Sequence, residues 1–210
     1  MTPVLEMPGL VLHPGEIALV LAVEREPMAA LTERCCGLRP QEPGEVRFLG
    51  EDWDALRADA ADRLRARIGA VTLEGGWPPQ LSVADSVILP AIHHRLLDRE
   101  AAVERASDLC CRFGLPGLPL AGPAALDEDD LARAALARAL VGRPDLLILE
   151  RPLRETAAPQ PLGPLLDAIA AGRHAATLWM TGSAALWSGS AIPATRRYRL
   201  GLRGLEEWRR

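Results

Sequence analysis

Four consecutive carboxylates, Asp127, Glu128, Asp129 and Asp130, form the longest acidic run of the sequence. Carboxylates spaced in this way could hold a divalent cation or bind a basic partner. They could also begin a helix, because Asp127 can act as its N-cap and acidic side chains in a first turn stabilise the helix dipole by about 0.3–1 kcal/mol each. We predict the helix-capping role and keep the cation or basic-partner site as the alternative.

Cysteine and histidine supply the other candidate metal ligands. The cysteines form two adjacent pairs, Cys35–Cys36 and Cys110–Cys111, and His93–His94 is an adjacent pair of histidines. Adjacent cysteines have neither the CxxC spacing of a zinc knuckle nor the spacing of a secreted disulfide framework. We therefore predict thiols that fill the core and no metal, with a zinc site joining them to the histidine pair as the alternative. His13 and His174 have no ligand partner at a useful spacing.

Arginine provides every positively charged side chain. All 24 basic residues are arginine, and the sequence contains neither lysine nor asparagine. A GC-rich coding bias is the simplest explanation for this joint absence. Without a side-chain amine, the protein cannot use Schiff-base chemistry, a lysine general base or the phosphate-binding lysine of a P-loop.

Length and composition are typical of one globular domain. The chain has 210 residues, of which 49% are hydrophobic and 25% charged, enough for a substantial core. Its net charge of −4 argues against nucleic acid as a partner, because such proteins usually present a basic excess to phosphates. We see no apolar run of about 20 residues and no signal-peptide pattern. We therefore expect a cytoplasmic protein, with a peripheral position at a membrane left open.

Apolar strands alternate with helices along the chain. The expected strands lie at 16–22, 43–50, 68–72, 146–149 and 176–180, and the expected helices at 30–36, 54–65, 83–95, 99–113, 127–141 and 162–171. Continuous apolar strands of this kind are buried on both faces, as in parallel sheets. The pattern predicts a parallel α/β sheet in which the mostly helical middle of the chain is an insertion.

Four ordered segments resemble the nucleotide-binding subunits of ABC transporters. Gly15–Val20 resembles the strand before the P-loop, Gly37–Val46 the segment after the first helix, and Ile68–Pro90 the Q-loop region. Arg133–Pro152 (RAALARALVGRPDLLILERP) looks like the helix after the signature motif running into the Walker B strand. Ser86–Pro90 and the histidines after it also look like the ATPases of MCE-type lipid transporters and of lipoprotein-release systems.

This resemblance covers nearly the whole chain and implies its fold class. That class is α/β, with a P-loop NTPase-like (ABC ATPase) parallel sheet core and an inserted helical subdomain. The expected domain is a single one over 1–210, with residues 1–75 and 138–210 in the α/β core and 76–137 in the helical subdomain.

The P-loop pattern GxxxxGK[ST] falls on Ala22–Ala29, where none of its required residues is present. Ala22 replaces the first glycine, and Pro27 lacks the N–H that would help to surround a phosphate. Met28 brings no charge and Ala29 no hydroxyl for Mg²⁺. Because a GC-driven loss of lysine should usually leave arginine, Met28 indicates relaxed function as well as biased composition.

The remaining positions that the family uses have also changed. The Q-loop glutamine falls on Leu73, the SGGQ of the signature on Asp127–Asp130, and the switch histidine on Gly182. Four carboxylates would repel a γ-phosphate. Glu150 stands at the Walker B aspartate and could still hold a cation. Arg151 stands at the catalytic glutamate, and a guanidinium cannot serve as a general base.

These losses predict a pseudo-ATPase with no catalytic residue and no cofactor, because binding of ATP and Mg²⁺ would be lost or strongly weakened. The resemblance implies a structural or regulatory subunit on the cytoplasmic face of the inner membrane, in an ABC transporter that could carry lipid. Its partner would be a membrane permease, together with a competent ABC ATPase subunit or a second copy. Trp77, Pro78, Pro79 and Gln80 are the permease-contact candidates, unless Trp77 only covers the subdomain junction.

Two alternatives remain from the residues. One is a soluble regulatory or scaffold pseudo-ATPase without a membrane partner. The other is an ATPase with a rebuilt site, in which Arg25 binds phosphate and Glu150 binds the metal.

Overall fold

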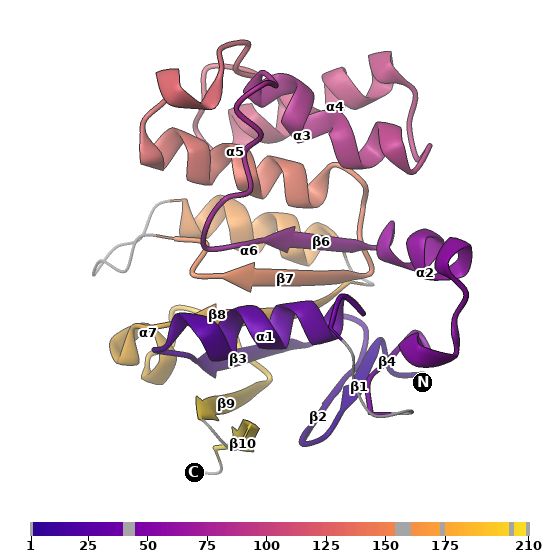
Figure 1. Ribbon diagram of the computed structural model, residues 1–210. Helices are drawn as coiled ribbons and strands as arrows, with labels where there is room; N and C mark the ends of the chain where they lie inside the picture. Colours follow the sequence, from indigo (N-terminus) through magenta and orange to yellow (C-terminus); the bar gives the residue numbers. More distant parts are fainter. Residues whose placement is uncertain (1, 40–44, 154–160, 173–174, 202–203, 209–210) are drawn as a thin grey trace.

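A six-stranded sheet forms the centre of the protein, which is described by a computed structural model (Figure 1). The described residues are 2–39, 45–153, 161–172, 175–201 and 204–208. The strand order is β10-β9-β3-β8-β7-β6, with β10 antiparallel to β9 and the other strands parallel. The strands are β3 (Ile17–Leu21), β6 (Ile68–Val71), β7 (Leu146–Glu150), β8 (Ala176–Thr181), β9 (Arg196–Gly201) and β10 (Gly204–Glu207).

The sheet confirms the predicted fold class and its inner strands. Strands β3, β6, β7 and β8 lie where uninterrupted apolar runs predicted them, and every residue of β7 and β8 is buried. Because helices cover both faces of a parallel sheet, side chains on both faces of its strands are buried, and a continuous apolar run therefore predicts a parallel strand.

Each face of the sheet carries its own hydrophobic cluster. Leu19, Leu149 and Trp179 belong to one cluster, together with residues of α6 (Leu162–Ala171). Their chain neighbours Val20, Ile148 and Met180 belong to the other, together with residues of α1 (Arg25–Cys35). Because successive side chains of a strand point to opposite faces, α1 and α6 cover opposite sides of the sheet.

A second, antiparallel sheet lies beside the first. Its order is β2-β1-β4-β5, formed by β1 (Leu5–Met7), β2 (Leu10–Leu12), β4 (Arg47–Phe48) and β5 (Glu51–Asp52). Gly9, with φ 80°, makes the tight turn between β1 and β2. Only Arg47–Phe48 of the strand expected at 43–50 is strand in the described part, and residues 43–44 lie outside it. Neither β1 nor β2 was predicted, because three-residue strands carry little periodic signal.

Three helices gather above β6 and β7 in the view of Figure 1. They are α3 (Val83–His93), α4 (Arg99–Arg112) and α5 (Glu128–Leu140), and each packs against the other two. We call them the helical block. The subdomain boundary expected at 137 falls inside α5, which runs on to Leu140. Below the block lies α2 (Ala58–Arg65), at the side of the sheet, preceded by the short η1 (Trp53–Ala55).

The first helix begins earlier than the sequence predicted. We expected it to begin at Ala30, but α1 begins at Arg25. Pro27 is tolerated there because the N–H groups of a first helical turn have no intrahelical partner in any case. Glu26 in that turn complements the helix dipole.

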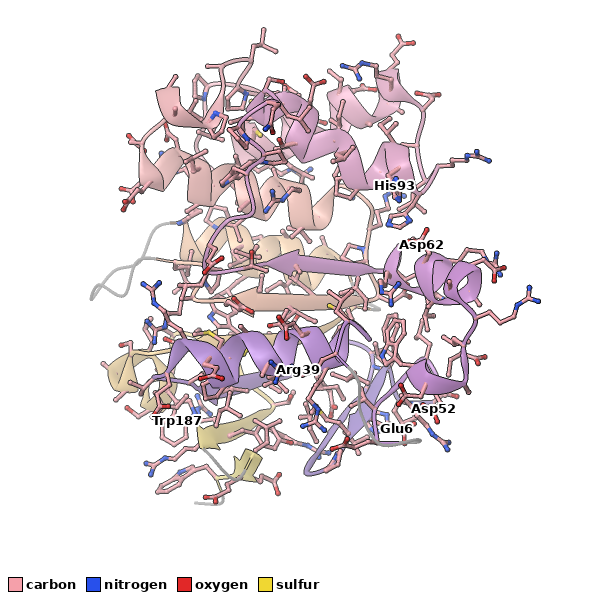
Figure 2. All side chains as sticks on the ribbon, viewed as in Figure 1. Glu6, Arg39, Asp52, Asp62, His93 and Trp187 are labelled. Carbon is pink, nitrogen blue, oxygen red and sulfur yellow. The ribbon has the colours of Figure 1, made fainter. Side chains whose placement is uncertain are left out.

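The C-terminal part holds elements that the sequence analysis did not identify, α7 (Ala184–Ser188) and the hairpin of β9 and β10. The sequence of β9 is rich in arginine, and Tyr198 is the one buried residue of this strand. The apolar pattern that would predict a strand is therefore weak. Arg199 lies against two indole rings, 5.0 Å from the centre of Trp187 and 4.5 Å from that of Trp208. Figure 2 labels Trp187 at this end of the molecule. Across the described residues, every helix is too short or too polar to cross a membrane.

Candidate functional site

The carboxyl ends of β3, β6, β7 and β8 bring together most of the positions at which the resemblance places the nucleotide. Ala22, Leu73, Arg151 and Gly182 follow these strands, and Glu150 ends β7. We call these residues the strand-end site. In parallel α/β sheets this edge is where ligands bind. A cavity of about 430 Å³ opens between it and α5, and its lining includes Arg25, Leu73, Trp77, Glu128, Glu150 and Arg151.

The segment at the P-loop positions does not form a phosphate cradle. Ala22, Val23 and Glu24 alone connect β3 to α1, so positions 25–29 are helical. The N–H of Ala22 donates to the carbonyl of Thr181 at 2.8 Å, as a continuation of the sheet. Met28 is 0% exposed and packs in the core beneath α1, whereas Ala29 is exposed. The side chain at the lysine position therefore points into the core and away from any ligand.

Arg151 bonds to this segment from the end of β7. Its Nη2 donates to the carbonyl of Ala22 at 3.2 Å and to that of Val23 at 2.5 Å. Its backbone N–H donates to the carbonyl of Met180 at 2.9 Å, and its φ of 43° is a left-handed conformation that costs a non-glycine residue about 1–3 kcal/mol. The segment thus presents oxygen atoms to a cation where a phosphate would need N–H donors.

Glu150 has become part of the protein interior. Its side chain is 4% exposed, and its Oε2 accepts a hydrogen bond from the N–H of Leu73 at 2.8 Å. This bond joins the end of β7 to the chain that leaves β6, so the two positions that would flank Mg²⁺ in the family are bonded to each other. Leu73 itself is half-buried and packs against the core on the α1 side.

Arg138 holds the loop that leads from β6 to α3. Its Nη1 donates to the carbonyl of Gly76 at 3.0 Å, its Nη2 bonds to the carbonyl of Gly75, and its guanidinium lies 4.3 Å from the centre of the Trp77 ring. Burial lowers the pKa of Arg138. Gly75 has φ 71°, and a Cβ there would lie 2.7 Å from Nε1 of Trp77, so this position requires glycine.

The permease-contact candidates differ in exposure. Trp77 is half-buried and packs against the core cluster of the helical block, and Pro78 is also half-buried. Pro79 and Gln80 are exposed. Trp77 therefore covers the junction of core and helical block. Arg138 was not predicted as a site residue. Its signal in the sequence was a single arginine within the buried stretch 134–139 of α5.

The acidic run has the predicted capping role. Oδ1 of Asp127 accepts the N–H of Asp130 at 2.8 Å, and Oδ1 of Asp130 accepts Nη1 of Arg133 at 2.9 Å. Glu128 is exposed and lines the cavity. Within the described residues, no cluster of three possible metal ligands includes a residue of this run.

Gly182 contributes no side chain to the strand-end site. It separates Thr181, whose Oγ1 accepts the N–H of Ser183 at 3.1 Å, from α7. Ser183 is the N-cap of that helix, and its Oγ accepts the N–H of Leu186 at 3.2 Å. The hydrogen bonds of the turn after β8 therefore stabilise the start of α7.

The cysteines are mainly core residues, as predicted. Cys35, Cys36 and Cys110 are buried, and burial raises the pKa of Cys36 to about 12 and that of Cys110 to about 12. Cys111 is exposed, which corrects its prediction as a core thiol. The zinc site that joins cysteines to His93–His94 is wrong in the described part, where the histidines cluster with Asp62 instead. His174 lies outside the described residues.

Comparison with known proteins finds relatives that are ATP-binding proteins of transport systems, although no family model matches the chain. The lipoprotein-releasing system ATP-binding protein LolD of Pseudomonas fluorescens is 33% identical over 144 residues, 68% of this chain. The chain spans 63% of that LolD, less than two thirds of its length. The macrolide export ATP-binding/permease protein MacB of Pasteurella multocida is 27% identical over 152 residues, 72% of this chain and 23% of MacB.

A solved structure shows the same fold. The ATP-binding cassette MJ0796, in a dimeric post-hydrolysis state bound to ADP and Pi, superposes with a TM-score of 0.75 at 21% identity. The match covers 96% of this chain and 90% of the cassette. The chain is therefore a homologue of the ATP-binding subunits of ABC transporters, and it has the fold of their ATPase cassettes.

Proposed function

We propose that this chain is a pseudo-ATPase subunit of a membrane ABC transporter, with a structural or regulatory role. The observation that carries the proposal is the contact of Arg151 with the carbonyls of Ala22 and Val23, above a core in which Met28 is 0% exposed. A guanidinium stands at the position of the catalytic glutamate, and a buried thioether stands at the position of the phosphate-binding lysine.

Two features of the segment after β3 oppose the binding of a nucleoside triphosphate. The backbone offers carbonyls where N–H donors are required, and Glu24 and Glu26 flank the start of α1 with negative charge. Hydrolysis also lacks a general base, because arginine remains protonated at every relevant pH. The proposed subunit therefore holds neither ATP nor Mg²⁺ in the usual way.

A nucleotide-dependent thermal shift tests this part of the proposal. A protein that binds Mg-ATP at 100 times its Kd gains about 2.7 kcal/mol, a rise in Tm of roughly 5–10 °C for a chain of this size. We expect no rise for this chain under conditions in which a LolD relative shows one. A clear rise with Mg-ATP, or ATP hydrolysis above the background, would contradict the pseudo-ATPase assignment.

The proposed partner is a membrane permease, with a lipid-linked cargo favoured by the lipoprotein-releasing relatives. Pro79 and Gln80 are exposed beside a loop that Arg138 and Trp77 hold rigid, so they are the part of the candidate contact that a partner can reach. A second copy or a competent ATPase subunit would complete the transporter.

Co-purification tests the permease contact. We expect the chain to be recovered from membranes with a multi-spanning permease, and the double variant Pro79→Asp/Gln80→Asp to lose it. Leu120→Asp is the matched control, because Leu120 is also exposed on a loop beside the helical block. A monodisperse soluble monomer without any membrane partner would favour a regulatory scaffold instead.

One observation favours a second candidate, the rebuilt ATPase. Arg25 and Glu150 line the same cavity, as a phosphate ligand and a metal ligand would. This candidate requires Glu150 to exchange its bond with the N–H of Leu73 for a cation. If Mg-ATP raises the Tm, and Arg25→Ala abolishes the rise, the rebuilt site is correct.

A further inference from the structure

We propose that Asp62, His93 and His94 form a binding site for zinc or a similar transition-metal ion between α2 and the end of α3. One ligand atom from each of the three residues lies within 4.8 Å of the others. Asp62 belongs to α2, His93 is the last residue of α3, and His94 is its C-cap. Figure 2 shows Asp62 and His93 facing one another at the side of the molecule.

The spacing of these atoms suits an ion better than a direct contact. Nδ1 of His94 lies 3.7 Å from Oδ2 of Asp62, which is longer than a hydrogen bond. Ligand atoms at 2.0–2.2 Å from a tetrahedral zinc are about 3.3–3.5 Å apart. A shift of a few tenths of an ångström would place this pair correctly. His93 is exposed and can turn to complete the set, leaving the fourth position to water.

The ligand types select the class of ion. Two imidazoles and one carboxylate are typical of zinc and other transition metals, whereas calcium and magnesium prefer sets made of oxygen. The rings of His93 and His94 meet edge to face, with their centres 4.7 Å apart, so their nitrogens can converge without stacked rings blocking access.

Neighbouring charges leave this cluster open to a cation. The two arginines that follow Asp62 on α2 have other partners. Arg63 pairs with Asp59 at 3.1 Å, and Arg65 donates to the carbonyls of Cys36 and Gly37 at 3.0 and 2.8 Å. In the described part of the chain, the one basic side chain with a nitrogen within 4.0 Å of the Asp62 carboxylate is the His94 imidazole. Asp62 therefore keeps its carboxylate for the cluster.

The scaffold on the histidine side is fixed by the end of α3. The N–H of His94 donates to the carbonyl of Pro90 at 3.2 Å, and that of Leu96 donates to the carbonyl of Ala91 at 2.9 Å. Because α3 packs within the helical block and α2 lies at the side of the sheet, a bound ion would link the two parts of the fold. This link differs from the Arg138 contact, which consists of direct hydrogen bonds, because it depends on an ion from solution.

Zinc binding to the metal-free full-length protein tests the proposal. The measurement is isothermal titration calorimetry with ZnCl₂, with the zinc-dependent rise in Tm as a second readout. We expect one saturable site, and we expect His93→Ala and Asp62→Asn each to weaken it at least tenfold. Asp54→Asn is the matched control, because it removes an exposed carboxylate of the neighbouring η1 and leaves the Arg63–Asp59 pair in place, and it should leave the affinity unchanged.

A further variant separates this site from thiol binding. Cys111 is exposed and can bind zinc by itself, so the titration is repeated with Cys111→Ser. Cobalt(II) gives an independent signature, because tetrahedral coordination produces strong visible bands and thiolate ligands add a charge-transfer band. Retained affinity in Cys111→Ser with no thiolate band supports the site. Absence of saturable binding, loss of binding in Cys111→Ser, or unchanged affinity in both His93→Ala and Asp62→Asn overturns it.

Discussion

Arg138 and Arg151 make the same kind of contact in two regions of the protein. Each guanidinium donates to the carbonyls of two consecutive residues, Gly75 and Gly76 for Arg138 and Ala22 and Val23 for Arg151. Arg138 does so from regular helix, with the Trp77 ring 4.3 Å away. Arg151 does so from a left-handed backbone at the end of β7.

The difference shows that arginine has two structural roles in this protein. In the Trp77 loop, arginine stabilises an architecture that the family fold also needs, the link from the sheet to the helical block. At the strand-end site, arginine bonds to the segment that follows β3, beside the cavity of about 430 Å³. The fork of five N–H donors suits both tasks, because it can satisfy several carbonyls from one charge.

Met28→Lys should have the largest effect of the changes that probe this comparison. Met28 is 0% exposed, so the ammonium would be buried without a partner, and we expect the free energy of unfolding to fall by about 3–5 kcal/mol. Urea denaturation measures this loss. Ala29→Lys, one position along the same helix and exposed, should change stability by no more than about 0.5 kcal/mol. A stable Met28→Lys variant that binds Mg-ATP would show that the strand-end site is still open.

Arg138→Ala should rank second. It removes charge-assisted bonds to two carbonyls and the contact with the Trp77 ring, for a loss of about 2–4 kcal/mol in urea denaturation. Arg133→Ala is the control on the same helix, where a surface pair with Asp130 contributes roughly 0.2–0.5 kcal/mol. Equal effects of the two changes would mean that the Trp77 loop is not held by Arg138.

Arg151→Ala should destabilise the protein less, by about 1–3 kcal/mol, because its bonds are at a partly open site and the left-handed backbone remains. We also expect this variant to show no thermal shift with Mg-ATP, since Met28 and Pro27 still occupy the phosphate-binding positions. A restored shift would identify Arg151 as the sole block. Arg25→Ala, which changes another arginine beside the same cavity, is the comparison variant.

Asp127→Ala should give the smallest effect, at the start of the helix that carries Arg138. Loss of its N-cap bond to the N–H of Asp130 should cost about 1 kcal/mol in thermal or urea denaturation. Glu128→Gln removes only a charge from the same turn and should cost a few tenths of a kcal/mol. If Asp127→Ala were neutral, the acidic run would need an explanation other than capping.

Sequence patterns predicted the sheet better than they predicted the ends of its helices. The runs at Ile17–Leu21 and Leu146–Glu150 are continuous and apolar, and a buried parallel strand is the structure that such runs favour. The predicted start of α1 at Ala30 was wrong, because the charged residues and the proline in the pattern of residues 23–29 indicated a connecting stretch before the helix. Pro27 looks like an obstacle in that pattern, yet it fits the first turn of a helix.

Contacts between residues that are distant in sequence could not be predicted from local sequence patterns. Asp62 and His93–His94 are separated in sequence by all of β6 and nearly all of α3, and their meeting depends on how α2 lies against the helical block. Arg138 reaches Gly75 and Gly76 in the same way. Cys111 is exposed while Cys110 is buried, since only the rotation of α4 against its neighbours decides which side chain faces inward.

The sequence by itself determined the fold class, the positions of the inner strands along the chain and the absence of lysine, because apolar periodicity and composition are local properties of the chain. The tertiary structure decided that Met28 faces the core, that Arg151 bonds to the Ala22 segment, and that Glu150 bonds to Leu73. These outcomes depend on which backbone atoms lie across the sheet edge. Only the packing of β3, β8, β7 and β6 in one sheet brings those atoms within hydrogen-bonding distance.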